Sequence, residues 1–265
     1  MEKLAIIFLL FFGVILAVPP VGTGEPGNTA PCAYPPFLTQ NVMPNVLIIF
    51  DNSGSMNWPA YVDTTSSSPQ VYDYGSYDPG RRYYGYAEPD SYYVYNDATK
   101  RFEYTTNWGT STDADPANKR FKGNFLNWLM SRRIDISRKV FVGGKVQDRS
   151  VPGPKTLIWE DPVQNRYFYK YWWCDDGCRW RFLNYYNQYL YAYSRNSSGR
   201  YSYKWRVLKR IIGPENPHGF IQNTAGRIRY AIMHFNDNQG GRIYEWMGAD
   251  AVSYTHLTLP TNREV

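Results

Sequence analysis

The feature that most constrains this fold is a short apolar run that ends abruptly in a polar turn. The run covers residues 45–50, Asn-Val-Leu-Ile-Ile-Phe, and Asp51-Asn52-Ser53-Gly54-Ser55 follows it directly. A continuous apolar run of this length predicts a strand covered on both faces, as in a parallel sheet. We therefore expect an α/β fold built around a mostly parallel sheet, with helices packed against it.

The polar turn offers oxygen ligands to a hard cation. Asp51, Ser53 and Ser55 alternate along it, and Mg²⁺ prefers oxygen ligands in octahedral geometry. Gly54 allows the sharp turn, and ligand sites of open α/β sheets lie at the carboxyl ends of strands. The pattern predicts that Asp51, Ser53 and Ser55 supply part of a site for Mg²⁺, or for Mn²⁺ or Ca²⁺. The alternative is a plain Asx turn that connects strand to helix.

Two further segments show clear periodicity. Apolar residues recur at helical spacing over residues 124–142, and Gly143-Gly144 provides a stop, which predicts one helix with a face on the sheet. Residues 227–235 predict a second strand, and residues 242–247 an antiparallel hairpin partner at the sheet edge. Asp237, in the turn between them, is a weaker ligand candidate because turn chemistry explains it equally well.

Two aromatic-rich segments, at about residues 57–120 and 147–220, interrupt this pattern and are predicted as insertions. The chain has 25 Tyr residues, and Tyr combines an apolar ring with a polar tip. In the second insertion, the spacing of Phe182, Tyr185, Tyr189 and Tyr193 predicts a helix. A strand with one exposed face is predicted where aromatic or apolar residues alternate with polar ones, at Tyr201, Tyr203, Trp205 and Val207.

The N-terminus has the pattern of a signal peptide. Residues 1–17 combine the charged start Met1-Glu2-Lys3 with an apolar run too short to span a bilayer, although an uncleaved anchor is the alternative. A Pro- and Gly-rich linker, 18–43, leads into a domain at 44–250. Residues 251–265 continue no pattern and are interpreted as a non-native tail. We expect an exported protein with no stable membrane span after signal cleavage.

Three cysteines add a weaker signal. In an oxidising compartment, Cys174 and Cys178 can close a small loop as a disulfide. A zinc site is the competing interpretation, but two cysteines at this spacing with no His nearby indicate zinc only weakly. Cys32 is left without an evident partner.

The stretch Pro44–Met56 resembles the opening of a von Willebrand factor A domain with its metal ion-dependent adhesion site. More narrowly, it resembles the PilY/PilC family of type IV pilus biogenesis and tip adhesin proteins. The Tyr-rich segment 77–86, the segment 123–144 and the segment 229–236 resemble that family as well. The resemblance implies a von Willebrand factor A-like, Rossmann-like domain with a mostly parallel sheet and two insertions.

The same resemblance implies a role in type IV pilus assembly and tip adhesion. The expected partners are the pilus tip or minor pilins and a host or abiotic surface. The expected location is the periplasm, the outer membrane or the cell surface at the pilus tip. The family completes its metal site with a Thr and an Asp from later loops, and it also has a C-terminal β-propeller; neither occurs here. The resemblance therefore implies an incomplete domain and a partial metal site.

Other function classes find less support in the sequence. The only histidines outside the suspect tail are His218 and His234, and neither a nucleophile elbow nor a phosphate-binding Gly-rich loop occurs, so we do not expect an enzyme. The net charge is +6, but Lys and Arg are spread along the chain, which makes nucleic acid an unlikely partner. The alternative function is an exported glycan- or nucleic-acid-binding module. It would use Tyr/Trp-rich insertions such as Tyr201–Arg210, without a functional metal site.

Overall fold

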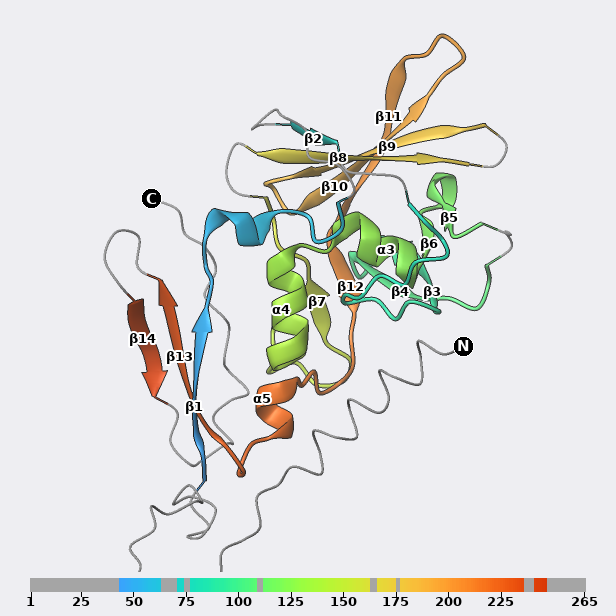
Figure 1. Ribbon diagram of the computed structural model, residues 1–265. Helices are drawn as coiled ribbons and strands as arrows, with labels where there is room; N and C mark the ends of the chain where they lie inside the picture. The colour runs from blue at the N-terminus through green and yellow to red at the C-terminus, as the bar shows by residue number, and fades with distance from the viewer. Residues whose placement is uncertain are drawn as a thin grey trace, which may run out of the picture. The chain divides into compact units, whose positions relative to one another are not determined.

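The computed structural model describes residues 43–62, 71–73, 77–108, 112–162, 166–174, 177–235 and 241–246 (Figure 1). At 71–73, 234–235 and 241–246 it describes the backbone alone. All of the described elements belong to the unit Met43–Val265. The expected signal peptide, nearly all of the linker, the expected tail, Cys32 and Asp237 lie outside the described residues.

The apolar run at 45–50 forms strand β1, Asn45–Phe50, in a three-stranded sheet with β13, Arg229–Phe235, and β14, Gly241–Trp246. β1 pairs in parallel with β13, so that Phe50 lies opposite His234. β13 and β14 form an antiparallel hairpin. The predicted strand, its later neighbour and the hairpin at the sheet edge are therefore confirmed.

One face of this sheet is covered by helices. Helix α4, Arg133–Val142, helix α5, Phe220–Asn223, and a 3₁₀ helix, Gly54–Asn57, pack near β1 and β13. Together they bury a small core made of Phe50, Ile134, Val142, Ile221, Tyr230 and Ile232. The expectation that a helix packs on the sheet is thus confirmed for α4.

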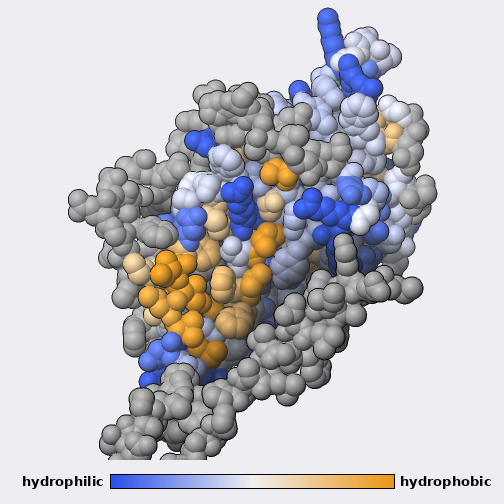
Figure 2. Space-filling view, viewed as in Figure 1, coloured by the Kyte–Doolittle hydropathy of each residue, from blue (hydrophilic) through white to orange (hydrophobic). Residues whose placement is uncertain are grey.

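The other face of β1 departs from the prediction. Leu47 and Ile49 are 49% and 58% exposed, whereas Phe50 is buried. The space-filling view shows an apolar patch over this part of the molecule (Figure 2). Among the described residues, β1 is therefore covered on one face only, because α4 and α5 pack on a single side of the sheet.

The segment predicted as one helix is divided in two. Helix α3, Gly123–Met130, ends before an extended pair of residues, Ser131 and Arg132, and α4 begins at Arg133. The break has a physical cause, because the Ser131 carbonyl accepts the backbone N–H of Ala60 instead of a helical partner. The predicted stop is correct: Gly143 ends α4 with φ of 80°.

A six-stranded sheet draws on both expected insertions. It has the order β5-β6-β3-β4-β12-β7. The strands are β3, Tyr92–Asn96; β4, Arg101–Tyr104; β5, Ala114–Asp115; β6, Arg120–Lys122; β7, Thr156–Ile158; and β12, Arg210–Ile212. A second 3₁₀ helix, Pro116–Asn118, connects β5 to β6.

A five-stranded sheet, ordered β11-β10-β9-β8-β2, contains the richest aromatic sequence. Its strands are β2, Val71–Asp73; β8, Tyr167–Trp173; β9, Arg179–Tyr185; β10, Tyr189–Arg195; and β11, Tyr201–Leu208. The helix predicted from Phe182 to Tyr193 is wrong, because these residues form the hairpin β9–β10. Their helical spacing arises from two strands with period-two burial and a turn in which Gln188 has a positive φ.

The five- and six-stranded sheets share one aromatic core around α3. Phe125 of α3 contacts Phe121 of β6 and Phe182 of β9, with ring centroids 5.6 and 5.9 Å apart. Trp205 of β11 also joins the two sheets. Its indole Nε1 donates to the carbonyl of Pro116, in the 3₁₀ helix between β5 and β6, over 2.7 Å. Each insertion is thus a folded part of one mixed α/β structure.

Most strand pairs in the three sheets are antiparallel, which differs from the expected mostly parallel sheet. The parallel pairs of the described residues are β1–β13, β4–β12 and β2–β8. In the part of the chain that the structure describes, no helix is long and apolar enough to cross a membrane.

Candidate functional site

The polar turn after β1 is an ordered loop at the carboxyl end of the parallel pair β1–β13. It starts with an Asx turn, in which the Ser53 backbone N–H donates to Asp51 Oδ1 over 2.8 Å. The 3₁₀ helix follows directly, and the Met56 backbone N–H donates to the Ser53 carbonyl over 2.9 Å. Asp51 and Ser53 are exposed, so the loop is open to a ligand from solvent.

The two serine hydroxyls of the loop lie close together. Ser53 Oγ and Ser55 Oγ are 2.9 Å apart. Neighbouring oxygen ligands on an octahedral Mg²⁺, at about 2.1 Å each, are about 3 Å apart. Both hydroxyls can therefore contact one cation, and Asp51 supplies the charge in the same turn. The residues present fit part of a metal site, although the same geometry also satisfies a plain Asx turn.

A complete acidic metal centre is not found in the described ranges. Across residues 43–246, with the gaps noted above, no group of three or more His, Cys, Asp or Glu side chains could hold a metal ion. A site at this loop therefore depends on hydroxyl oxygens, on water, and on ligands supplied from elsewhere. Such a site carries little negative charge, so its cation stays able to accept a carboxylate from a partner.

The segment that follows the loop is fastened to the break between α3 and α4. The Ala60 backbone N–H donates to the Ser131 carbonyl over 2.9 Å, and the Arg133 N–H donates to the Trp58 carbonyl over 3.1 Å. The Arg133 guanidinium also lies 5.6 Å from the centroid of the Trp58 ring. The helix break thus holds the chain on the far side of the candidate loop.

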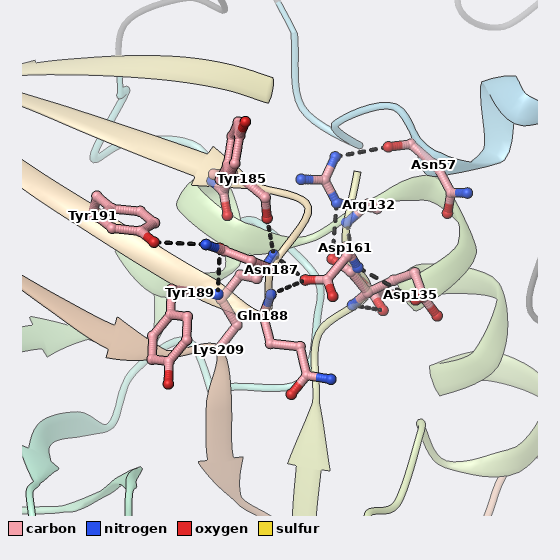
Figure 3. Close-up of polar contacts among 12 residues, drawn as sticks. Asn57, Arg132, Asp135, Asp161, Tyr185, Asn187, Gln188, Tyr189, Tyr191 and Lys209 are labelled. Atoms are coloured by element: carbon pink, nitrogen blue, oxygen red, sulfur yellow. Dashed lines mark hydrogen bonds and ion pairs between the residues drawn. The ribbon is translucent and has the colours of Figure 1, made fainter. Parts of the chain in front are cut away.

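Arg132, in that break, is a buried cation with three roles. Its Nη1 donates to the Asn57 carbonyl over 2.7 Å, and its Nε donates to the Glu160 carbonyl over 2.9 Å (Figure 3). The guanidinium lies 4.6 Å from the centroid of the Phe168 ring, on strand β8. One side chain therefore connects the 3₁₀ helix of the candidate loop to the five-stranded sheet.

Asp135 accepts hydrogen bonds from three different residues of this region. Its Oδ2 accepts the Arg132 backbone N–H over 3.0 Å, which caps the start of α4. Its Oδ1 accepts the Glu160 backbone N–H over 3.0 Å and the Tyr86 hydroxyl over 3.2 Å. The carboxyl group is fully buried, and this burial raises the pKa of Asp135 to about 6.

The pKa of the neighbouring carboxylate, Glu160, is shifted in the opposite direction. Glu160 accepts hydrogen bonds from the Arg138 guanidinium and, over 2.9 Å, from the Lys145 ammonium. Burial alone would raise its pKa, but the charges of Arg138 and Lys145 outweigh it and lower the pKa of Glu160 to about 2. Glu160 thus stays ionised, and Asp135 is the carboxyl group of this pair that takes up a proton first.

A second ion pair, between the buried Lys209 and the partly exposed Asp161, joins the same segment to the other sheets. Lys209 Nζ lies 2.5 Å from Asp161 Oδ1, and it donates to the Tyr185 carbonyl over 3.2 Å (Figure 3). The Gln188 backbone N–H donates to the same Asp161 oxygen over 3.1 Å. Burial lowers the pKa of Lys209 to about 8, although Asp161 favours its charged form.

The remaining predicted site residues lie apart from the loop. Cys174 and Cys178 are joined as a disulfide at the tip of the β8–β9 hairpin, with Cα atoms 5.1 Å apart. The exposed His218 has its Nδ1 2.8 Å from the Asn216 carbonyl. His234 lies on β13 opposite Phe50, and its side chain is outside the described residues.

The buried ionic network was not foreseen from the sequence. Its members are far apart along the chain, and charged residues at such positions ordinarily predict a solvated surface. Arg132 and Asp135 lie in the middle of the segment predicted as one helix, 124–142, so no local pattern indicated a helix start there.

Helices α3 and α4 and much of the six-stranded sheet fall within one family match. Residues 74–164 match a family model described as the small alpha/beta domain of PilY1 homologues. This match supports a PilY1-related protein. It covers about a third of the chain and contains α3, α4, Asp135 and Glu160, but none of the strands of the five-stranded sheet. Neither curated proteins nor solved structures gave a match.

The matched PilY1-like range begins inside the first expected insertion and ends inside the second. It includes Tyr86, whose hydroxyl reaches Asp135, and the helix break that anchors the candidate loop. The loop itself, at residues 51–55, precedes the match. A PilY1-like domain indicates a function related to type IV pili, and the loop adds a feature that the match does not cover.

Proposed function

We propose that this chain serves type IV pilus assembly and tip adhesion, and that it binds a surface or a protein partner through a cation held at Asp51, Ser53 and Ser55. The observation that carries the proposal is the exposed pair of hydroxyls, 2.9 Å apart, in an ordered loop at the carboxyl end of a parallel strand pair. The PilY1-like range supports the pilus-related part. The expected partners are minor pilins and a host or abiotic surface, met in the cell envelope or outside the cell.

The proposed role of the cation is to bridge the loop and an acidic group of the partner. Mg²⁺ is the expected ion, with Mn²⁺ or Ca²⁺ as substitutes, because all available donors are oxygen atoms. The Asp51 carboxylate and the two hydroxyls would hold it on one side, and a partner carboxylate would complete its coordination. The role of the buried network is to keep the loop in place, since Arg132 binds the carbonyl of Asn57 immediately after it.

Titration of the protein with Mn²⁺, followed by electron paramagnetic resonance, tests the metal site. We expect weak binding, on the order of millimolar, because few ligands come from the loop. Asp51→Asn and Ser55→Ala should each abolish it. Asp148→Asn is the matched control, since Asp148 forms the same Asx turn with Ser150, over 2.8 Å, away from β1. Binding that survives Asp51→Asn would place the ligands elsewhere and contradict the proposal.

Adhesion is tested separately on a quartz crystal sensor. The wild-type protein should be retained on an abiotic surface in Mg²⁺ and released by a chelator, and the Asp51→Asn protein should be retained in neither condition. Retention that is equal with Mg²⁺ and with the chelator would show that adhesion does not use this loop.

A further inference from the structure

The outward face of the five-stranded sheet is a continuous surface of tyrosine and arginine. Along β8, β9 and β10 burial alternates, so every second side chain points away from the aromatic core. The sheet lies at the top of Figure 1, with β11 at its edge. The outward tyrosines and arginines of these three strands are Tyr167, Tyr169, Tyr171, Arg179, Arg181, Tyr185, Tyr189, Tyr191, Tyr193 and Arg195.

A β-bulge extends this surface onto β11. The pairing of β10 with β11 shifts register between Ala192 and Tyr193, so Ala192 faces Trp205 while Tyr193 faces Tyr203. The sequence pattern placed Tyr203 and Trp205 on one side, but the bulge turns Trp205 into the core and leaves Tyr203 54% exposed on the outside. The bulge therefore adds aromatic area to the outer face at the sheet edge.

The charged residues of β8, β9, β10 and β11 have one sign. The sequences of β8, β9, β10 and β11 contain no Asp or Glu. Their outward or exposed cations are Arg179, Arg181, Arg195, Lys204 and Arg206. A surface with this composition attracts anions, because no carboxylate on these four strands neutralises its arginines.

Arg181 shows how the cations are held. Its guanidinium lies 4.9, 4.8 and 4.7 Å from the ring centroids of Tyr169, Tyr193 and Tyr201. Its Nε is buried and has no hydrogen-bond partner. The planar guanidinium is thus packed among tyrosine rings. Arg206 repeats the arrangement over Tyr189, at 4.8 Å.

We propose that this tyrosine–arginine face docks single-stranded nucleic acid. Base rings would stack on the tyrosines, and the phosphates would pair with the arginines beside them, as in sequence-tolerant single-strand binders. The proposal is independent of the metal loop, because the surface consists of β8–β11 and holds its cations without any metal.

The tyrosine rings of this face favour flat bases over the sugar rings of an acidic glycan. Tyr169 and Tyr171 have centroids 6.3 Å apart, and so do Tyr189 and Tyr191. Their ring planes are inclined at 37° and 59°, so a base stacks on one tyrosine at a time. A sugar ring has no aromatic face, so an acidic glycan would pair with the arginines without this stacking.

Fluorescence anisotropy with a labelled oligo(dT) of about 12 nucleotides tests the proposal on the full chain in a chelator. We expect binding that weakens about tenfold or more between about 50 and about 200 mM salt. Tyr203→Leu should weaken it about fivefold or more, and Tyr203→Phe should stay close to wild type, because stacking needs the ring and not the hydroxyl.

Two arginine substitutions complete the design. Arg206→Gln should weaken binding and reduce the salt slope by about one, whereas Arg82→Gln should leave both unchanged, since Arg82 pairs with Asp90 outside these strands. Absence of binding, binding indifferent to salt, or equal losses in Tyr203→Leu and Tyr203→Phe would overturn the proposal. A polyuronate is also added as a competitor in the same assay. If it displaces the labelled oligo(dT), and excess oligo(dT) does not restore binding, the face belongs to an acidic glycan instead.

Discussion

At the residue scale, the buried charges give this protein its specific internal connections. Arg132, Asp135 and Lys209 are almost fully buried, and each has partners of opposite charge or backbone groups of complementary polarity. Breaking a buried pair costs more than making it gains, because the remaining group is left uncompensated. These residues therefore fix which segments meet, more than they add to the net stability.

Asp135 predicts a specific pH dependence of stability. Its folded pKa of about 6 exceeds the ordinary value of 3.8, so the folded state binds this proton more tightly. The stabilisation that comes from protonated Asp135 is complete below about pH 4 and is lost as the pH rises through about 6. Over this range the free energy of unfolding falls by an amount on the order of 3 kcal/mol. Urea unfolding of the wild type and of Asp135→Asn at pH 4.5 and 7 measures about 2 kcal/mol of this change. Asp135→Asn should lack this component, and an identical pH difference in both proteins would contradict the assignment.

At the element scale, backbone conformation and local packing decide where the helices end. α3 and α4 form one helical pattern in the sequence, but the tertiary bonds of Ser131 and Arg132 separate them. α4 then ends at Gly143, where a left-handed residue allows the chain to turn toward His218. A Cβ at Gly143 would lie 2.4 Å from the His218 backbone nitrogen.

A pair of glycine substitutions separates conformational strain from steric clash. Gly143 and Gly153 have nearly the same φ, +80° and +77°, but a Cβ at Gly153 has no atom within 4 Å. Gly153→Ala should cost about 1 kcal/mol from strain alone. Gly143→Ala should cost about 2 kcal/mol more, because backbone atoms must move. Thermal unfolding of both variants measures the difference, and equal costs would show that the packing against His218 is not tight.

At the scale of the whole molecule, two cores of unequal size hold the sheets. The core around α3 is large and aromatic, whereas the three-stranded sheet rests on the small core that includes Phe50, Ile134 and Ile232. β1 also lies at the edge of its sheet, with Leu47 and Ile49 exposed. The three-stranded sheet therefore has less buried apolar area to resist opening.

Native-state hydrogen exchange should reveal this difference. Amides of β1 that bond to β13 should exchange through a local opening of lower free energy than amides of β9 and β10, because fewer buried contacts must be broken. Exchange at several low denaturant concentrations, read by mass spectrometry of peptides, measures both. Equal opening free energies for β1 and β9 would show that the two cores unfold as one unit.

The sequence by itself determined the local features. The strand 45–50, the Asx turn at Asp51, the hairpin β13–β14 and the stop at Gly143 each depend on neighbouring residues, so local patterns were sufficient to predict them. The resemblance to a pilus protein family likewise came from sequence, and the match over residues 74–164 agrees with it in its coarse form.

Only the tertiary structure decided which residues meet. The break at Ser131, the hairpin in place of a helix at Phe182–Tyr193, and the bulge that separates Tyr203 from Trp205 all depend on contacts between distant segments. The buried network of Arg132, Asp135 and Glu160 has the same origin. Period and propensity describe one segment at a time, whereas burial, ion pairing and register are properties of pairs of segments, and these are fixed when the chain packs.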